Sequence, residues 1–184
     1  MKKIPLLFVV WSLIAFSCQE EAEPETVFGR YVVQSIVADQ AMDISGGGVS
    51  AVDLLSQFES MRIWPQSIFV SLYSPQEFNV GYSQVVFTIP FQSEEDPKLG
   101  FGNGSFGRRA DISADGRMSL DWSLAPDFDQ PDQLHQSIRV EGVRLLENAE
   151  KELEVVLQQT FFDQGTREWV DARVTYKLQL EKGT

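Results

Sequence analysis

The stretch Glu168–Leu180, EWVDARVTYKLQL, alternates apolar and polar side chains along its whole length. One side of it carries apolar residues almost exclusively: Val170, Ala172, Val174, Tyr176, Leu178 and Leu180. A period of two residues is typical of a β-strand that buries one face. This stretch therefore predicts a strand of an antiparallel sheet with its apolar face turned toward a core.

Other stretches of the chain have the same β character. Besides the closing stretch, strands are expected over Phe28–Asp39, Ile63–Tyr73, Val85–Phe91, Phe106–Ser113, Arg117–Leu124, Ser137–Leu146 and Glu152–Phe162. Ala114-Asp115-Gly116 is a turn signal that joins two of them into a hairpin. The apolar alternation changes phase across Gly142, which predicts a β-bulge there.

Helical periodicity is confined to one short segment. Ser50–Phe58 is expected to form one helix, with Ser50 as its N-cap. Gln92–Gly104 and Ala125–Gln133 are polar and charged, and we expect them to be loops. About eight antiparallel strands joined in sequence, with one apolar face, must close or fold over. The fold class is therefore all-β, an antiparallel meander closed into a barrel or a strongly curved sandwich.

The start of the chain has the features of a secretory signal. Lys2 and Lys3 precede the 13 uncharged residues Ile4–Phe16, a length within the range of about 7–15 for a signal h-region. A helix of that length rises roughly 20 Å, too short for a hydrocarbon core of about 30 Å. We therefore expect export across the inner membrane.

Ala15-Phe16-Ser17-Cys18 resembles the lipobox of bacterial lipoproteins, and Cys18 is the only cysteine of the chain. The resemblance implies that residues 1–18 contain a lipoprotein signal peptide, that cleavage makes Cys18 the new N-terminus, and that acyl chains on Cys18 hold the protein in a membrane. Two or more acyl chains are enough for stable anchoring. The alternative is an ordinary cleavage site that leaves Cys18 as a free thiol.

The acidic run that follows predicts a flexible tether over residues 19–26, ahead of one β domain over residues 27–184. Gln19-Glu20-Glu21 resembles the short acidic signal of surface-exposed lipoproteins of the Bacteroidetes group. This resemblance implies an outer-membrane location with the domain displayed on the cell surface. A periplasm-facing position at the same membrane is the alternative.

Charge and cysteine content bound the possible partners. After residues 1–18 are removed, basic residues fall from 15 to 13 against 27 acidic ones. This balance argues against nucleic acid, which requires clustered Lys and Arg. No cysteine is left in the β domain, so its stability cannot depend on disulfides.

Two motifs and the strand order together resemble the lipocalin-like lipoproteins of Bacteroidetes. Gly29-Arg30-Tyr31 stands where lipocalin relatives have Gly-x-Trp, and Met42–Phe58 is similar to their loop followed by a short helix. The resemblance implies a lipocalin-like barrel of eight to ten strands with an internal or open-ended pocket. It implies no enzyme activity.

Aromatic residues in the expected strands are the candidate lining of such a pocket: Tyr31, Phe69, Phe87, Phe91, Trp122, Phe161 and Tyr176. Pockets for small apolar ligands are lined mainly by apolar and aromatic side chains. The alternative is a solid core, because small barrels are commonly filled by their own side chains.

Few residues suggest metal binding or catalysis. Asp43 begins a loop that follows the first half of a calcium site, but the later oxygen ligands are missing. Asp127 and Asp129 form an acidic cluster that could bind Ca²⁺ or hydrolyse a glycoside. His135 is the only histidine, so a histidine metal site is excluded. We expect no cofactor and no metal.

The sequence therefore predicts a non-catalytic, lipid-anchored binding module for a small apolar ligand or an outer-membrane protein. The alternative is a structural or accessory subunit of an outer-membrane complex with a filled core. A hydrolase using the loop carboxylates is a third hypothesis. An interior cavity of about 300 Å³ or more would favour ligand binding, and a filled interior would favour docking.

Overall fold

A computed structural model of the chain describes residues 27–77, 82–92, 101–113, 116–121, 138–146 and 151–181, and the side chains of 101–103 are not described. These residues form one sheet with an α-helix and a 3₁₀ turn. Their bounds are β1 Gly29–Met42, β2 Ala51–Asp53, α1 Leu55–Ser60, η1 Pro65–Ser67, β3 Phe69–Tyr73, β4 Ser83–Gln92, β5 Phe101–Ile112, β6 Arg117–Asp121, β7 Ile138–Leu146, β8 Glu152–Asp163 and β9 Glu168–Leu180.

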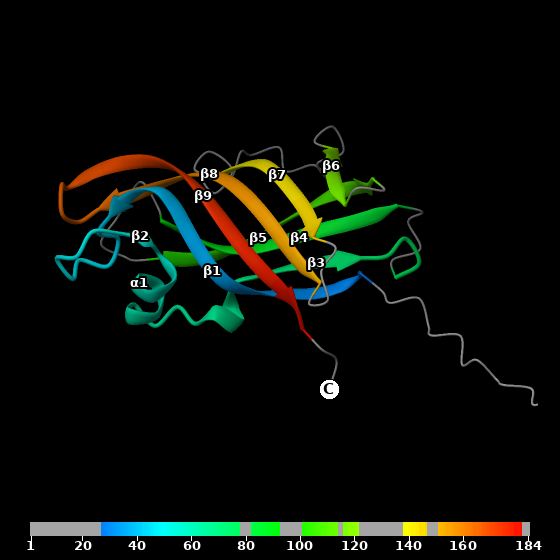
Figure 1. Cartoon of the computed structure of the whole chain (residues 1–184), viewed down its shortest axis with the longest axis horizontal. Helices are drawn as coiled ribbons and strands as arrows, with labels where there is room; N and C mark the ends of the chain where they lie inside the picture. The colour runs from blue at the N-terminus through cyan, green and yellow to red at the C-terminus, as the bar shows by residue number, and fades with distance from the viewer. Residues whose placement is uncertain are drawn as a thin grey trace, which may run out of the picture.

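The sheet closes on itself. Its order is β2-β1-β3-β4-β5-β6-β7-β8-β9, and β1 also pairs with β9. All of these pairings are antiparallel. The result is a closed barrel of eight strands with β2 as an extra strand, so the barrel alternative of the predicted fold class is confirmed (Figure 1).

Strand β1 is the junction of the barrel. Its first residues, 29–32, pair with β3, and residues 31–38 pair with β9 on the other side. Further along, Met42 pairs with Ala51 of β2. One long strand thus closes the ring and also carries the extra strand.

The three closing strands agree with the sequence prediction almost to the residue. In β9 the predicted apolar side is buried from Ala172 to Leu178, and Asp171, Arg173 and Lys177 on the opposite side are exposed. The predicted bulge is present, because the register of β7 against β8 shifts between Val140 and Gly142.

The predicted hairpin turn is also confirmed. Gly116 has a φ of +78° and its N–H donates to the carbonyl oxygen of Ser113 at 2.9 Å. A Cβ at Gly116 would lie 2.3 Å from the carbonyl oxygen of Leu145, so the backbones approach too closely for any other residue. The second arm, β6, is described as far as Asp121.

Three predictions near the helix and loops need correction. The helix expected over Ser50–Phe58 is shorter, because residues 51–53 pair with β1 as β2 and the N–H of Leu54 bonds to the carbonyl oxygen of Ile36 at 2.9 Å. Ser50 is therefore not its cap. The strand expected over Ile63–Tyr73 begins only at Phe69, after the 3₁₀ turn η1 that Pro65 starts.

The loop expected over Gln92–Gly104 was also too long. Its last four residues belong to β5, which pairs with β4 as far as the Gln92–Phe101 pair. Glycines 102 and 104 disguise the strand in the sequence because they are rare inside strands.

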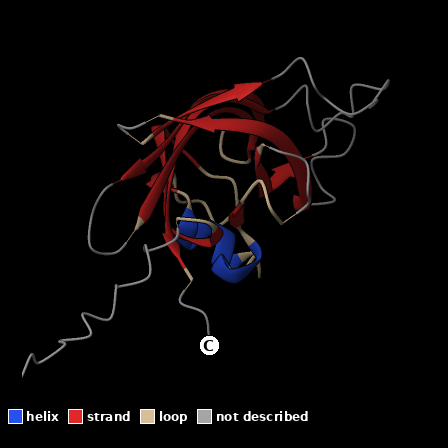
Figure 2. Cartoon of the chain, turned by 90° about the vertical axis from the view of Figure 1, so that its right-hand side faces the viewer, coloured by secondary structure: helices blue, strands red, loops and turns tan. Residues whose placement is uncertain are grey.

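Both helical segments lie on the same side of the barrel (Figure 2). The helix α1 packs there through Phe58, which is fully buried and contacts the ring of Phe161 with 6.4 Å between ring centroids. We call this end of the barrel, formed by α1, the end of β1 and the β8–β9 turn, the capped end.

Candidate functional site

Most of the aromatic candidates for a pocket lining are part of the packed core. Tyr31, Phe87, Phe161 and Tyr176 are no more than 1 % exposed. Phe87 stacks on Phe106 with 4.9 Å between ring centroids and 20° between ring planes. These four residues belong to the buried core cluster of the barrel.

The remaining aromatic candidates lie elsewhere. Phe69 is half-buried beneath the guanidinium of Arg30, whose Cζ is 4.1 Å from the ring centroid. Phe91 is half-buried and packs against the edge of the core. Trp122 lies outside the described residues, as do Cys18, Asp127 and Asp129.

Two strands from opposite sides of the barrel meet at the capped end. Strands β4 and β8 are four places apart in the ring of eight, yet side chains join them directly. The amide of Gln159 donates to the carbonyl oxygen of Pro90 at 2.6 Å, and the amide oxygen of Gln92 accepts from the N–H of Phe162 at 2.7 Å. Side chains therefore connect these two walls across the barrel at the capped end.

Tyr176 completes this cross-wall contact. Its hydroxyl donates to the amide oxygen of Gln159 at 2.8 Å, so both polar ends of that glutamine are satisfied. Burial raises the pKa of the Tyr176 hydroxyl well above its ordinary value, because the phenolate would have to be desolvated. The tyrosine is a neutral structural donor and has no features of an acid–base catalyst.

Asp43 lies in a loop at the capped end with its carboxylate 2 % exposed. One carboxylate oxygen accepts from the N–H groups of Gly46 (2.8 Å) and Gly47 (3.2 Å) and from the hydroxyl of Ser45 (3.2 Å), and the other accepts from the N–H of Gly48 (2.7 Å). Gly46 and Gly48 have positive φ, which lets successive N–H groups converge on one anion.

Gln57 and Asp163 tie this loop to the rest of the capped end. The Gln57 side chain accepts from the N–H of Ile44 and donates to the carbonyl oxygen of Met42, both at 2.8 Å. The carboxylate of Asp163 accepts from the N–H groups of Asp43 (3.2 Å) and Gly165 (2.8 Å). The buried side chains of Gln57 and Asp163 thus have hydrogen-bond partners within the protein.

This arrangement does not resemble a metal centre. Both oxygens of the Asp43 carboxylate face hydrogen-bond donors, whereas Ca²⁺ requires six to eight converging oxygens. Within the described ranges, no group of three or more His, Cys, Asp or Glu residues is placed to hold a metal ion. The loop is instead a backbone turn built around a carboxylate.

A small hollow lies at the seam between β6 and β7. Among the described residues, these strands pair at two positions, Arg117–Arg144 and Met118–Val143. The hollow has a volume of about 100 Å³ and is lined by Met118, Leu120, Val140, Glu141, Gly142 and Val143. It is smaller than the roughly 300–1,000 Å³ of sites that enclose small ligands.

A larger hollow lies outside the barrel wall, and we call it the outer groove. It has a volume of about 450 Å³ and is lined by Val32, Gln34, Gln66, Gln179, Leu180 and Glu181. These residues come from β1, from η1 and from the end of β9. The outer groove therefore lies near the start of β1 and the end of β9 (Figure 1).

Arg30 holds the two sides of the outer groove together. Its guanidinium donates to the carbonyl oxygen of Gln66 at 2.5 Å and lies 3.6 Å from the carboxylate of Glu181. The ring of Phe69 lies beneath that guanidinium and fixes its position. The Arg30 side chain thus contacts both η1 and Glu181, the residue that follows β9.

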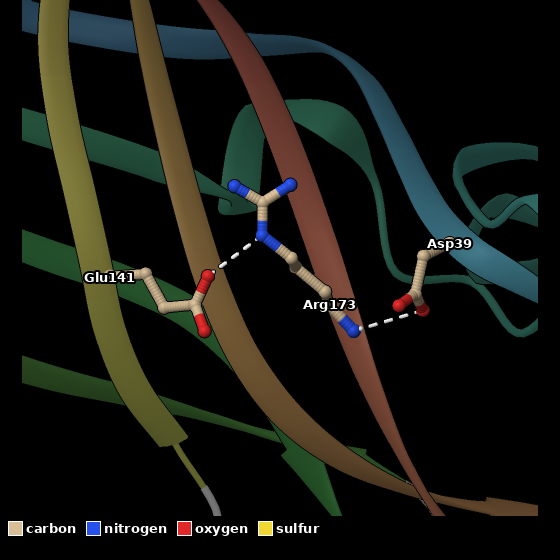
Figure 3. Close-up of polar contacts among 3 residues, drawn as sticks. All are labelled: Asp39, Glu141 and Arg173. Atoms are coloured by element: carbon tan, nitrogen blue, oxygen red, sulfur yellow. Dashed lines mark hydrogen bonds and ion pairs between the residues drawn. The ribbon is translucent and has the colours of Figure 1, made fainter.

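Further along β1, polar contacts also connect strands on the outer surface of the barrel. The backbone N–H of Arg173 on β9 donates to the carboxylate of Asp39 on β1 at 3.0 Å. The guanidinium of Arg173 reaches over β8 and donates to Glu141 on β7 at 2.7 Å (Figure 3). These contacts connect three strands, β1, β9 and β7, across the outside of the barrel.

The outer groove was missed by the sequence analysis. Gln34 and Gln179 sit at positions that the alternation places on the outer face of strands, where a polar residue is ordinary. Only the fold brings Gln66, which follows a proline at the 3₁₀ turn, beside them. No sequence signal links these three positions.

A comparison of the chain with family models, with curated proteins and with solved structures finds no match. No helix in the part of the chain that the structure describes is long and apolar enough to cross a membrane.

Proposed function

We propose that this protein is a lipid-anchored, non-catalytic binding module that docks on an outer-membrane protein through the outside of its barrel. Acyl chains on Cys18 hold it at the outer membrane, with the domain on the cell surface; a periplasm-facing domain is the alternative. The barrel is a structural platform and its surface makes the contacts.

The observation that supports this proposal is the contact between opposite walls at the capped end. Gln159 and Gln92 connect β4 to β8, and fully buried aromatic rings occupy the interior beside them. A barrel that carries a small apolar ligand needs an enclosed site of roughly 300 Å³ or more. The hollow at the β6–β7 seam, which described residues line, has a volume of about 100 Å³ and is below that size.

The anchor is tested by metabolic labelling with a palmitate analogue. Labelling of the wild-type protein, and its loss in Cys18→Ser, is the expected result because the acyl chains are attached at that residue. An unlabelled wild-type protein, or equal labelling of both, would remove the proposed location.

Docking through the outer surface is tested by photo-crosslinking in the native envelope. A photoreactive amino acid is placed at Arg139 or Arg173, two exposed outward positions, in separate full-length variants. We expect at least one position to give a discrete adduct with an outer-membrane protein. Absence of any adduct at both positions and at Gln40 and Glu154, two further outward positions, would contradict docking on this face.

A further inference from the structure

We infer that the outer groove binds a neutral saccharide. This inference goes beyond docking on an outer-membrane protein, and it shares with the proposed function only the view that recognition takes place outside the barrel. Two observations support it. The first is the chemistry of the side chains that line the groove, and the second is the strand pairing, which excludes a peptide that would add to the sheet.

Three of the six residues that line the outer groove are glutamines, and their side chains have few hydrogen-bond partners among the described residues. The side chains of Gln66 and Gln179 make no hydrogen bond with the part of the chain that the structure describes, and that of Gln34 makes one of 3.4 Å to the carbonyl oxygen of Val32. A primary amide both donates and accepts hydrogen bonds. Three such groups around one groove match a ligand whose polar groups are themselves donors and acceptors, as sugar hydroxyls are.

The apolar part of the lining fits the same ligand. Val32 and Leu180 are half-buried and lie among the glutamines. A pyranose ring has an apolar C–H face as well as hydroxyl groups at its edge, so it can contact both kinds of side chain. The volume of about 450 Å³ lies within the usual range for small-ligand sites.

The charge of the groove and of the chain selects a neutral ligand. Glu181 is the one ionisable residue in the lining, and its carboxylate lies 3.6 Å from Arg30. The whole chain carries a formal net charge of −12, which repels anionic ligands at long range. A phosphorylated or uronic-acid ligand would therefore be disfavoured.

The strand pairing excludes an extended peptide that adds to the sheet. Such a peptide needs a free strand edge with unpaired N–H and C=O groups. At Val32 in the groove, β1 is paired on both sides, with Phe69 of β3 and with Gln179 of β9. The groove therefore offers side chains and not a backbone edge.

Arg30 is the positioning residue of this site. It bonds to the carbonyl oxygen of Gln66 and pairs with Glu181, so it sets the distance between the two walls. A lysine at this position would keep the positive charge but lose the planar, multi-donor geometry of the guanidinium. Arg30→Lys should then weaken binding without changing the groove's own amides.

The test uses saturation-transfer NMR on the full chain in a zwitterionic detergent, because sugar-headed detergents would compete. The probes are maltotriose, cellotriose and triacetylchitotriose, with trigalacturonate as the anionic comparison. We expect at least one neutral trisaccharide to bind and trigalacturonate to bind more weakly. Gln34→Ala/Gln66→Ala/Gln179→Ala should lose binding by about tenfold or more, because several hydrogen bonds are removed.

The matched control is Gln40→Ala/Gln158→Ala, which removes two glutamines of the outer surface that are not part of the groove lining. It should bind like the wild type, and the thermal melt of the triple variant should match that of the control. The inference is overturned if no neutral trisaccharide binds, if the triple variant binds as well as the control, or if trigalacturonate binds best. None of these results bears on the photo-crosslinks at Arg139 and Arg173.

Discussion

Glutamines are used in opposite ways at the capped end and at the outer groove. At the capped end they are buried and their amides bond to the protein: Gln57, Gln92 and Gln159. At the outer groove they lie at the surface, and among the described residues their side chains make one hydrogen bond, of 3.4 Å: Gln34, Gln66 and Gln179. The same side chain holds the fold together in one region and is available to a ligand in the other.

The glutamines differ in role because the two regions differ in how the backbone N–H and C=O groups find hydrogen-bond partners. At the capped end the walls β4 and β8 meet without pairing, so their carbonyl and N–H groups require side-chain partners. At the outer groove the backbone of β1 pairs at Val32 with both β3 and β9. Variants should therefore have large effects on stability at the first site and small ones at the second.

The largest effect is expected for Gln159→Leu. This change leaves the carbonyl oxygen of Pro90 and the hydroxyl of Tyr176 buried without their partner. The free energy of unfolding should fall by about 3 kcal/mol, as each unsatisfied buried group costs roughly 1–3 kcal/mol. Its neighbour Gln158 faces outward, and Gln158→Leu should change stability by less than about 0.5 kcal/mol in the same urea titration.

Asp43→Asn should be the next most damaging change. It replaces an anion that accepts four hydrogen bonds by a neutral amide whose NH₂ group meets an N–H donor. Loss of charge-assisted bonds should lower the free energy of unfolding by about 2 kcal/mol. Because those bonds occupy the carboxylate, the melting temperature of the wild type should not respond to added Ca²⁺; a clear rise that Asp43→Asn abolishes would restore the calcium-site hypothesis.

Tyr31 should give the wild type a stability that falls at alkaline pH. Burial raises the pKa of the Tyr31 hydroxyl to about 12, against an ordinary value of 10.0, and the neutral hydroxyl donates to the carbonyl oxygen of Val27. Between these two values the unfolded chain is ionised and the folded chain is not, so stability is lost as pH rises from about 10 to 12. Urea unfolding at pH 9 and 11 should show a smaller decrease in Tyr31→Phe, and an equal decrease would contradict this assignment.

The smallest effect is expected on the outer surface. Arg173→Ala removes the ion pair with Glu141 but leaves the backbone bond to Asp39. Exposed ion pairs contribute about 0–1 kcal/mol, and the guanidinium of Arg173 is exposed. The loss in unfolding free energy should stay within that range and should shrink further at high salt. A loss above about 2 kcal/mol would mean that the outer contacts, and not the capped end, hold the barrel closed.

Local sequence patterns were sufficient for the regular part of the fold. The alternation in β9 and the phase change at Gly142 depend only on neighbouring residues, so both could be predicted. The helix could not be bounded in the same way, because residues 51–53 pair with a distant part of β1. Long-range pairing decided the structure where local propensity suggested otherwise.

The barrel interior and the outer groove were harder to predict, because they also depend on contacts between residues that are distant in the sequence. Sequence alternation indicates which aromatic residues face inward, but not whether the space between them is open. That outcome depends on Gln159 reaching Pro90, a contact between residues 69 positions apart. The outer groove depends likewise on Arg30 reaching Gln66, 36 residues later in the chain.

We propose that the barrel carries no ligand inside and that recognition takes place on its outer surface. Native mass spectrometry of the full-length, acylated protein taken from its own envelope tests this most directly, because detergent is removed in the gas phase. We predict a mass equal to that of the acylated polypeptide, with no small apolar molecule bound. A stoichiometric apolar molecule that survives detergent removal, and that is lost when Val155→Phe fills the interior, would contradict the account.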